Sequence, residues 1–223
     1  MPFDKTLTNA MYNTCVALPD KVAFTQSFFR GGPFFAEKAE HAIQWFCFQY
    51  TGSKHREFAT IGSFRSDTIR QAHVDGIVVN EVRTHRAGML FGKPDQAPAL
   101  ILSNKVASTT HPVVGASFFF QPKEGQTEAL RELLRSTILP AVEADTETRY
   151  WYAYEFPEHE FASIPWPEQQ FAIFAFWDSK EKREKSLNAG PWAAALAANE
   201  DKLLEKVPEI NPFDMISAYV KLE

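Results

Sequence analysis

The residues best able to do acid–base or metal chemistry are the histidines, whose side chains titrate near neutral pH. Four of the six, His41, His55, His73 and His85, lie within residues 1–107, and Glu37 precedes His41 by one helical turn. None belongs to an HxH, HExxH or Cys/His grouping, the spacings typical of zinc sites. We therefore expect no metal ligand set.

Other signatures of catalysis or cofactor binding are also missing from the sequence. There is no GxSxG nucleophile motif, no GxGxxG after a strand and no GxxxxGK[ST] phosphate loop. Cys15 and Cys47 form no CxxC pair, and we interpret both as buried thiols. The sequence therefore predicts no bound cofactor.

Aromatic side chains are the most unusual feature of the composition. The 223 residues include 20 Phe, 5 Trp and 6 Tyr. Such residues form flat, rigid walls, which suit either an aromatic core or a cavity for a large planar apolar ligand.

Charge and hydropathy exclude several classes of partner. The formal net charge is -5, without the basic excess that nucleic-acid binding or polybasic membrane docking requires. The N-terminus lacks the pattern of a signal peptide, and apolar stretches such as Phe171–Trp177 are too short to span a bilayer. We expect a cytoplasmic protein that binds neither nucleic acid nor membranes.

The elements that must position any site repeat once along the chain. The segment Phe58–Asp67 reads as an apolar strand that runs into a polar helix start, and Phe171–Lys180 reads the same way 113 positions later. Arg70 and Arg183 keep this spacing. The order of elements persists more clearly than the identities of the residues.

Hydrophobic periodicity predicts the elements of each copy. In the second copy we expect strands at Val113–Phe120, Tyr150–Phe156, Phe171–Trp177 and Asp214–Val220, and helices from Gly125 to Val142, after Ser179, and from Pro191 to Lys206. In the first copy we expect strands at Met11–Leu18, Ala42–Tyr50, Phe58–Phe64 and Ala99–Val106, and helices at Asp20–Phe29 or Phe34–Glu40, Ser66–Asp75 and Ile77–Leu90.

The predicted order is β-α-β-β-α-β in each copy, the ferredoxin-like pattern of an α+β protein. We place the copies at residues 1–107 and 113–223, with residues 108–112 as a linker. Because a lone unit leaves one sheet face uncovered, two units on one chain favour an intramolecular pseudo-dimer that forms an eight-stranded barrel. The chain is expected to be either a monomer of this kind or a homodimer of such chains.

The segments Phe58–Val79 (FATIGSFRSDTIRQAHVDGIVV) and Phe171–Ala198 (FAIFAFWDSKEKREKSLNAGPWAAALAA) carry a family resemblance. Each resembles the strand, short capped helix, small-residue break and second helix of the dimeric α+β-barrel superfamily, within it the antibiotic biosynthesis monooxygenase-like group. That group has a histidine near the end of the short helix. Only the first copy matches, as His73, whereas Ser186 stands at this place in the second.

The resemblance implies a small-molecule cavity between sheet and helices in each half. It suggests a cofactor-independent monooxygenase for a bulky aromatic or polyketide-derived substrate, with O2 as co-substrate and His73 as the base. Cyclase, isomerase or lyase chemistry and non-catalytic ligand binding are the alternatives. Candidates to line the cavities, or to orient His73, are Trp45, Trp151, Tyr152, Trp192, Arg70 and Asp75.

Overall fold

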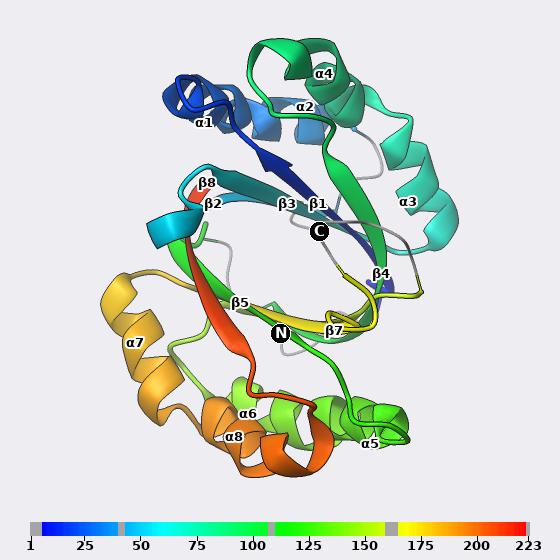
Figure 1. The fold of residues 1–223 in the computed structure, drawn as a ribbon, viewed down its shortest axis with the longest axis vertical. Coiled ribbons are helices and arrows are strands. Elements are labelled where there is room, and N and C mark those ends of the chain that lie inside the picture. Colours follow the sequence, from blue (N-terminus) through cyan, green and yellow to red (C-terminus); the bar gives the residue numbers. More distant parts are fainter. Residues whose placement is uncertain (1–5, 40–42, 107–109, 159–164, 222–223) are drawn as a thin grey trace. The chain divides into compact units, whose positions relative to one another are not determined.

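The computed structural model describes residues 6–39, 43–106, 110–158 and 165–221. It is a mixed α+β structure whose antiparallel strands follow the closed order β1-β3-β2-β8-β5-β7-β6-β4 (Figure 1). The strands are β1 (Asn9–Val16), β2 (Gln44–Tyr50), β3 (Glu57–Phe64), β4 (Asp95–Val106), β5 (Val114–Phe120), β6 (Tyr150–Glu155), β7 (Phe171–Trp177) and β8 (Glu209–Val220).

The helices fall between these strands as the repeat predicts. They are α1 (Val22–Arg30), α2 (Gly32–Lys38), α3 (Asp67–Val74), α4 (Ile77–His85), α5 (Thr127–Glu132), α6 (Leu139–Ala144), α7 (Lys180–Ala189) and α8 (Pro191–Leu203). A π-helical turn, Leu133–Ile138, joins α5 to α6. Proline has no N–H to donate and collides with the carbonyl four residues back, so Pro140 favours this wider turn just before it.

The chain divides into two compact units. The unit that we call N-terminal contains Thr6–Ala99 and Phe213–Glu223, and the C-terminal unit contains Leu100–Glu160 and Ile164–Pro212. Strands β4 and β8 each pass from one unit into the other, so that the last strand of each repeat completes the sheet of the other unit.

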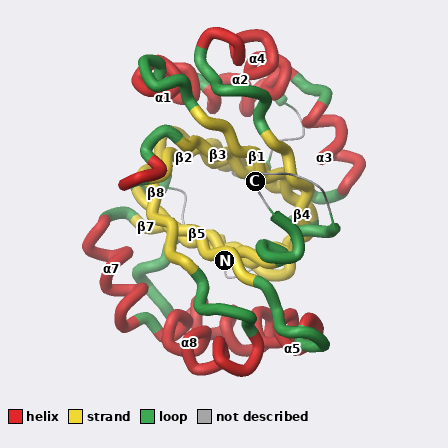
Figure 2. Tube along the Cα trace, in the orientation of Figure 1, coloured by secondary structure: helices red, strands yellow, loops and turns green. Residues whose placement is uncertain are grey.

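In the N-terminal unit, β3 pairs with both β1 and β2, and β2 also pairs with the end of β8. One sheet face carries Trp45, Cys47 and Phe58, which pack against Phe29 and Val78 of the helices. Figure 2 shows the helices on one side of these strands. The strand pattern therefore separates a helix-covered face from the opposite face.

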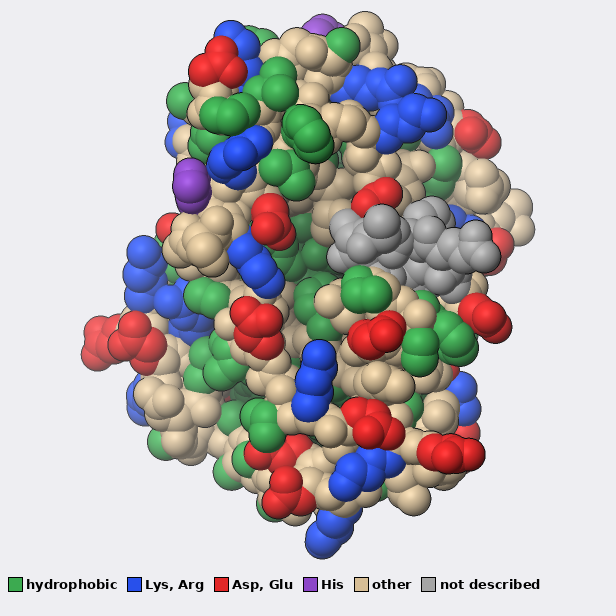
Figure 3. All heavy atoms as spheres, viewed as in Figure 1, with side chains coloured by type: hydrophobic (Ala, Val, Ile, Leu, Met, Phe, Trp, Pro, Cys, Tyr) green, Lys and Arg blue, Asp and Glu red, His purple; other side chains and the backbone are tan. Residues whose placement is uncertain are grey.

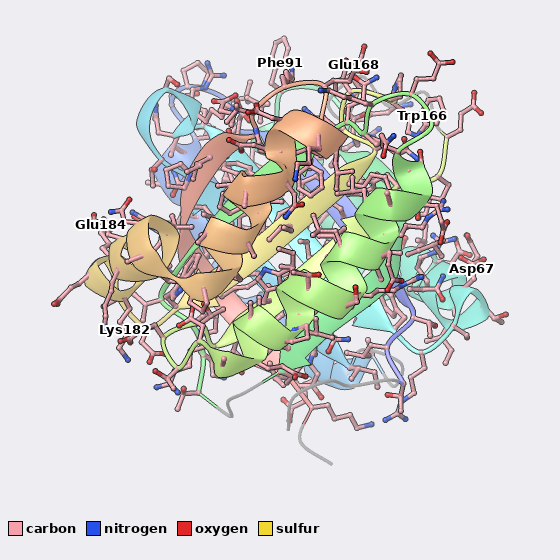
Figure 4. The ribbon with its side chains drawn as sticks, turned by 90° about the horizontal axis from the view of Figure 1, so that it is seen from below. Asp67, Phe91, Trp166, Glu168, Lys182 and Glu184 are labelled. Atoms are coloured by element: carbon pink, nitrogen blue, oxygen red, sulfur yellow. The ribbon has the colours of Figure 1, made fainter. Side chains whose placement is uncertain are left out.

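The C-terminal unit has the same plan. Val114, Trp151 and Ile173 belong to a buried cluster with residues of α5, α8 and the π-helical turn. Figure 4 looks onto these helices and shows Lys182 and Glu184 pointing outward from α7, as expected for a solvated charged face.

Helix starts preserve the repeat at the level of single hydrogen bonds. The Ser66 side chain accepts a hydrogen bond from the Ile69 N–H at the start of α3, and 113 positions later Ser179 accepts one from Lys182 at the start of α7. Serine at this position satisfies a backbone donor that the helix leaves free. The predicted tandem β-α-β-β-α-β order is confirmed.

Several element boundaries differ from the prediction, and two of the differences have a clear physical reason. Both α1 and α2 form, where the sequence left alternatives, because Gly31 ends one helix and Pro33 suits the first turn of the next. Strands β4 and β8 begin at Asp95 and Glu209, earlier than predicted, because the first residues of each strand still belong to the unit of its own repeat and include polar residues that hide the strand pattern. The predicted linker 108–112 and His41 lie wholly or partly outside the described residues.

Candidate functional site

A cavity of about 390 Å³ lies inside the N-terminal unit. Its wall comes from β1, β2 and β3 on the sheet side and from α1, α2, α3 and α4 on the other. Most of the lining is apolar, and the aromatic and aliphatic members are Phe28, Phe29, Phe35, Trp45, Val78, Val79 and Val82. This volume and lining are typical of a site for a small aromatic molecule.

Trp45 forms one wall of the cavity. A side chain at Gly32, which begins α2, would meet the Trp45 indole ring. The break between α1 and α2 thus places a bare backbone against the ring, and glycine is the residue that permits this approach.

His73 also lines the cavity, from the last turn of α3. It is only 6% exposed, and its ring lies 5.0 Å from the ring of Phe64, centre to centre. Burial lowers the pKa of His73 to about 4. The imidazole is therefore neutral at pH 7 and can accept a proton, although it is a weaker base than the near-neutral pKa of free histidine suggests.

The predicted orienting residues, Arg70 and Asp75, make no hydrogen bond to the His73 ring in the described part of the chain. The Arg70 guanidinium binds the carboxylate of Asp67, with an Nε–Oδ1 distance of 2.8 Å, and Asp75 caps the end of α3. Figure 4 shows Asp67 on the outer surface. Within the described part of the chain, nothing hydrogen-bonds to the imidazole of His73, which leaves its nitrogens for a ligand.

A small polar group forms part of the sheet side of the cavity. The Asn13 side chain donates from Nδ2 to Thr60 Oγ1 at 2.9 Å, while its Oδ1 is buried without a partner among the residues described. Cys15 lies on the same face of β1, and burial raises the pKa of its thiol to about 12, so it stays protonated. A buried carbonyl oxygen without a donor favours a ligand that supplies a hydroxyl or N–H.

Charged side chains also line the cavity, at its more exposed parts. Arg83 and Arg86 come from the end of α4, and Lys93 precedes β4. Glu81 is the acidic member of the lining, and its carboxylate faces His85, with an Oε2–Nδ1 distance of 3.6 Å. Figure 3 shows Lys and Arg side chains on the surface near α4.

The C-terminal unit places different side chains at the equivalent positions. Ser186 stands where the other unit has His73, and Trp192 stands where it has Val78. Trp151 corresponds to Trp45, because these residues pair with Ala175 and Gly62, which are 113 positions apart. Trp151 and Trp192 are completely buried in the apolar cluster of their unit.

Hydrogen bonds tie Ser186 into this packed region. Ser186 and Thr148 both donate to Asp145 Oδ2, at 2.6 and 2.7 Å, and Trp192 Nε1 donates to Ser186 Oγ at 3.1 Å. Burial acts to raise the pKa of Asp145, but these hydrogen bonds hold it below its usual value. The carboxylate of Asp145 is therefore an anion whose charge is stabilised by hydrogen bonds within its own unit, which suits a structural role.

Tyr152 lies apart from both groups. It alternates with Trp151 along β6 and stacks on Tyr154, with ring centres 5.7 Å apart, on the sheet face opposite the helices. The structure thus brings Trp45 and His73 together at one cavity and places Trp151, Tyr152 and Trp192 in the other unit.

In the ranges that the structure describes, no group of three or more His, Cys, Asp or Glu side chains could hold a metal ion. None of the helices there combines the length and apolarity needed to cross a membrane.

Known structures share this arrangement of elements. A protein from Fusobacterium nucleatum described as a putative monooxygenase aligns over 98% of this chain and 96% of its own, with a TM-score of 0.80 and 8% identity. Another so described, from Lactobacillus acidophilus, aligns over 96% of both chains with a TM-score of 0.75 and 6% identity. The chain therefore shares the fold of these proteins, a closed eight-stranded α+β barrel built from two tandem units.

An anthrone oxidase-like protein has the same fold at lower similarity. It aligns over 96% of this chain and 93% of its own, with a TM-score of 0.56 and 14% identity. No family model matches the sequence, and no curated protein matches it. At these identities the likeness concerns the fold, which hosts more than one chemistry.

Several residues that line the cavity were not predicted from the sequence. Asn13 lies in β1 and Thr60 in β3, and the two residues are paired across these strands. The sequence pattern of each strand does not reveal that this pair lies beside a cavity. The charged residues of α4 look like an ordinary solvated helix face. The one available signal was their clustering within a few residues of the predicted helix end.

Proposed function

We propose that the chain is a cofactor-independent monooxygenase that acts on a bulky aromatic or polyketide-derived molecule of the phenol, quinol or anthrone type. The observation that carries this proposal is the aromatic-walled cavity that contains a buried, neutral His73. The fold of proteins described as putative monooxygenases and anthrone oxidase-like supports it.

The proposed chemistry begins with proton transfer from the substrate to His73. The anion left on an electron-rich ring then donates electrons to O2, so that the substrate is its own reductant. For an anthrone the balance is one CH2 group and one O2 converted to one C=O group and one H2O. Such a step requires a base and a cavity that excludes water, and both fit the wall around His73.

The low pKa of His73 constrains the substrate. Proton transfer from an ordinary phenol, with a pKa near 10, to a base of pKa about 4 is uphill by roughly 8 kcal/mol. The substrate must therefore be more acidic than a simple phenol, or the cavity must stabilise its anion. The neighbouring cationic side chains Arg83, Arg86 and Lys93 supply charge of the required sign.

Oxygen uptake with a panel of anthrones and quinols tests the proposal. We expect one O2 consumed per turnover, and one labelled oxygen atom in the product when 18O2 is used. His73→Gln should lower turnover by roughly 10²–10⁴-fold, the usual contribution of a positioned base. Melting temperatures should be measured alongside, so that a loss of folded protein is not mistaken for a loss of catalysis.

The same experiment separates the alternatives. Conversion of a substrate without oxygen uptake indicates cyclase, isomerase or lyase chemistry, and a ligand that binds and returns unchanged indicates a binding protein. Unchanged turnover in His73→Gln, or a larger loss from Ser186→Ala at equal folded fraction, would contradict the assignment of His73.

The proposal also includes a cytoplasmic location and a chain that acts as a monomer or as a homodimer.

A further inference from the structure

The charged part of the cavity lining is unbalanced. Arg83, Arg86 and Lys93 contribute three cations, against one carboxylate from Glu81. This local excess is opposite in sign to the formal net charge of -5 carried by the whole chain. The overall composition of the protein therefore does not explain why three cationic side chains gather beside this apolar cavity.

The cations are not neutralised by neighbours in the described part of the molecule. Arg83 donates to the neutral side-chain oxygen of Asn80 at 3.2 Å, and neither Arg86 nor Lys93 has an ion-pair partner among the residues that the structure describes. Glu81 faces His85 instead. The three side chains therefore remain available to an anion.

Arg86 is the most informative of the three. It is half-buried, whereas Arg83 and Lys93 are exposed, and it follows α4 directly at the point where the chain turns toward β4. A half-buried guanidinium loses part of its hydration, so a bound carboxylate gains more there than at a fully exposed lysine.

We propose that the ligand of the cavity is an aromatic acid: its rings lie against Trp45 and the phenylalanines, and its carboxylate or equivalent anion binds Arg86, with Arg83 and Lys93 beside it. This inference rests on the proposed function for the nature of the aromatic part. It adds the anionic group, which selects acids over their neutral esters and decarboxylated analogues.

Binding of matched ligands tests this inference without any turnover. The intrinsic fluorescence of the full chain, to which Trp45 contributes from the cavity wall, would be titrated with 1-hydroxy-2-naphthoic acid and with its methyl ester. We expect the acid to bind about tenfold more tightly than the ester, the effect of one charge-assisted contact. Added salt should weaken binding of the acid and leave binding of the ester nearly unchanged.

Charge-removing variants locate the contact. Arg86→Gln should weaken binding of the acid by about five- to tenfold and leave the ester unaffected. Lys206→Gln, which removes one exposed cation from the C-terminal unit, is the matched control and should change neither. Equal binding of acid and ester, no binding of either, or equal effects of the two variants would overturn the inference.

The outcomes for the two proposals are distinguishable. An acid that binds through Arg86 but consumes no oxygen leaves this inference intact and contradicts the monooxygenase. Oxygen uptake with a neutral substrate, together with no preference for the acid, contradicts this inference alone.

Discussion

The imidazole of His73 is uncharged in the folded chain because burial lowers its pKa to about 4. The unfolded chain returns this pKa to its ordinary value of about 6.5. Between these two values the unfolded state binds more protons than the folded state, so acid favours unfolding. The same burial that makes His73 a neutral acceptor therefore links the stability of the chain to pH.

We predict that His73 contributes a pH-dependent loss of stability between about pH 6.5 and about pH 4. The free energy of unfolding should fall across this window by up to roughly 3 kcal/mol more in the wild type than in His73→Gln, which has no titrating ring. Urea unfolding at a series of pH values measures both proteins. Parallel curves for the two would show that His73 is not buried as described.

Ser186 illustrates the opposite role at the equivalent position. Its hydroxyl donates to Asp145 and accepts from Trp192, so its removal leaves a buried acceptor and a buried donor short of a partner. We predict that Ser186→Ala lowers the free energy of unfolding by about 1–3 kcal/mol. Ser136→Ala, which removes an exposed hydroxyl, is the control and should cost under about 0.5 kcal/mol. A Ser186 variant as stable as this control would argue against the network.

At the scale of elements, a glycine separates the two helices that follow the third strand in each repeat. Gly76 precedes α4 and Gly190 precedes α8, and both have φ values that any residue can adopt. The two glycines differ in how much room each leaves for a Cβ atom. A Cβ at Gly190 would lie 2.2 Å from the Ser186 carbonyl oxygen, whereas at Gly76 the nearest atom, the His73 oxygen, is 3.1 Å away.

We predict that Gly190→Ala is more destabilising than Gly76→Ala. The first forces the backbone of α7 and α8 apart and should cost about 1–3 kcal/mol, while the second needs only a small adjustment. Thermal or chemical denaturation of the two variants makes the comparison. Equal costs would mean that the spacing of α7 and α8 is set elsewhere.

At the scale of the whole chain, the two repeats share one order of elements but differ in how their side chains fill the space between sheet and helices. The N-terminal unit has Val78 beside a cavity, and the C-terminal unit has Trp192 in a packed core. The difference in side-chain size at this one position accounts for much of the asymmetry, together with the exchange of His73 for Ser186.

Exchanging these residues provides a direct test. Val78→Trp should fill part of the cavity and weaken ligand binding by at least about tenfold, since the bulky ring occupies the position of the ligand. The reverse change, Trp192→Val, should cost about 3–5 kcal/mol because it leaves a void and removes a hydrogen bond to Ser186. Calorimetric titration and denaturation measure the two effects. Undiminished ligand binding in a folded Val78→Trp would place the ligand elsewhere.

The order of elements and the repeat could be predicted from the amino-acid sequence, because both depend on local patterns. Short continuous apolar runs in strands such as Phe171–Trp177, and serine caps at Ser66 and Ser179, act over a few neighbouring residues. The position of the cavity could not be predicted from the sequence, because it depends on side chains that the fold brings together from distant positions. Trp45, His73 and Arg86 meet around one space, while Trp151 and Trp192, equally aromatic in sequence, fill theirs.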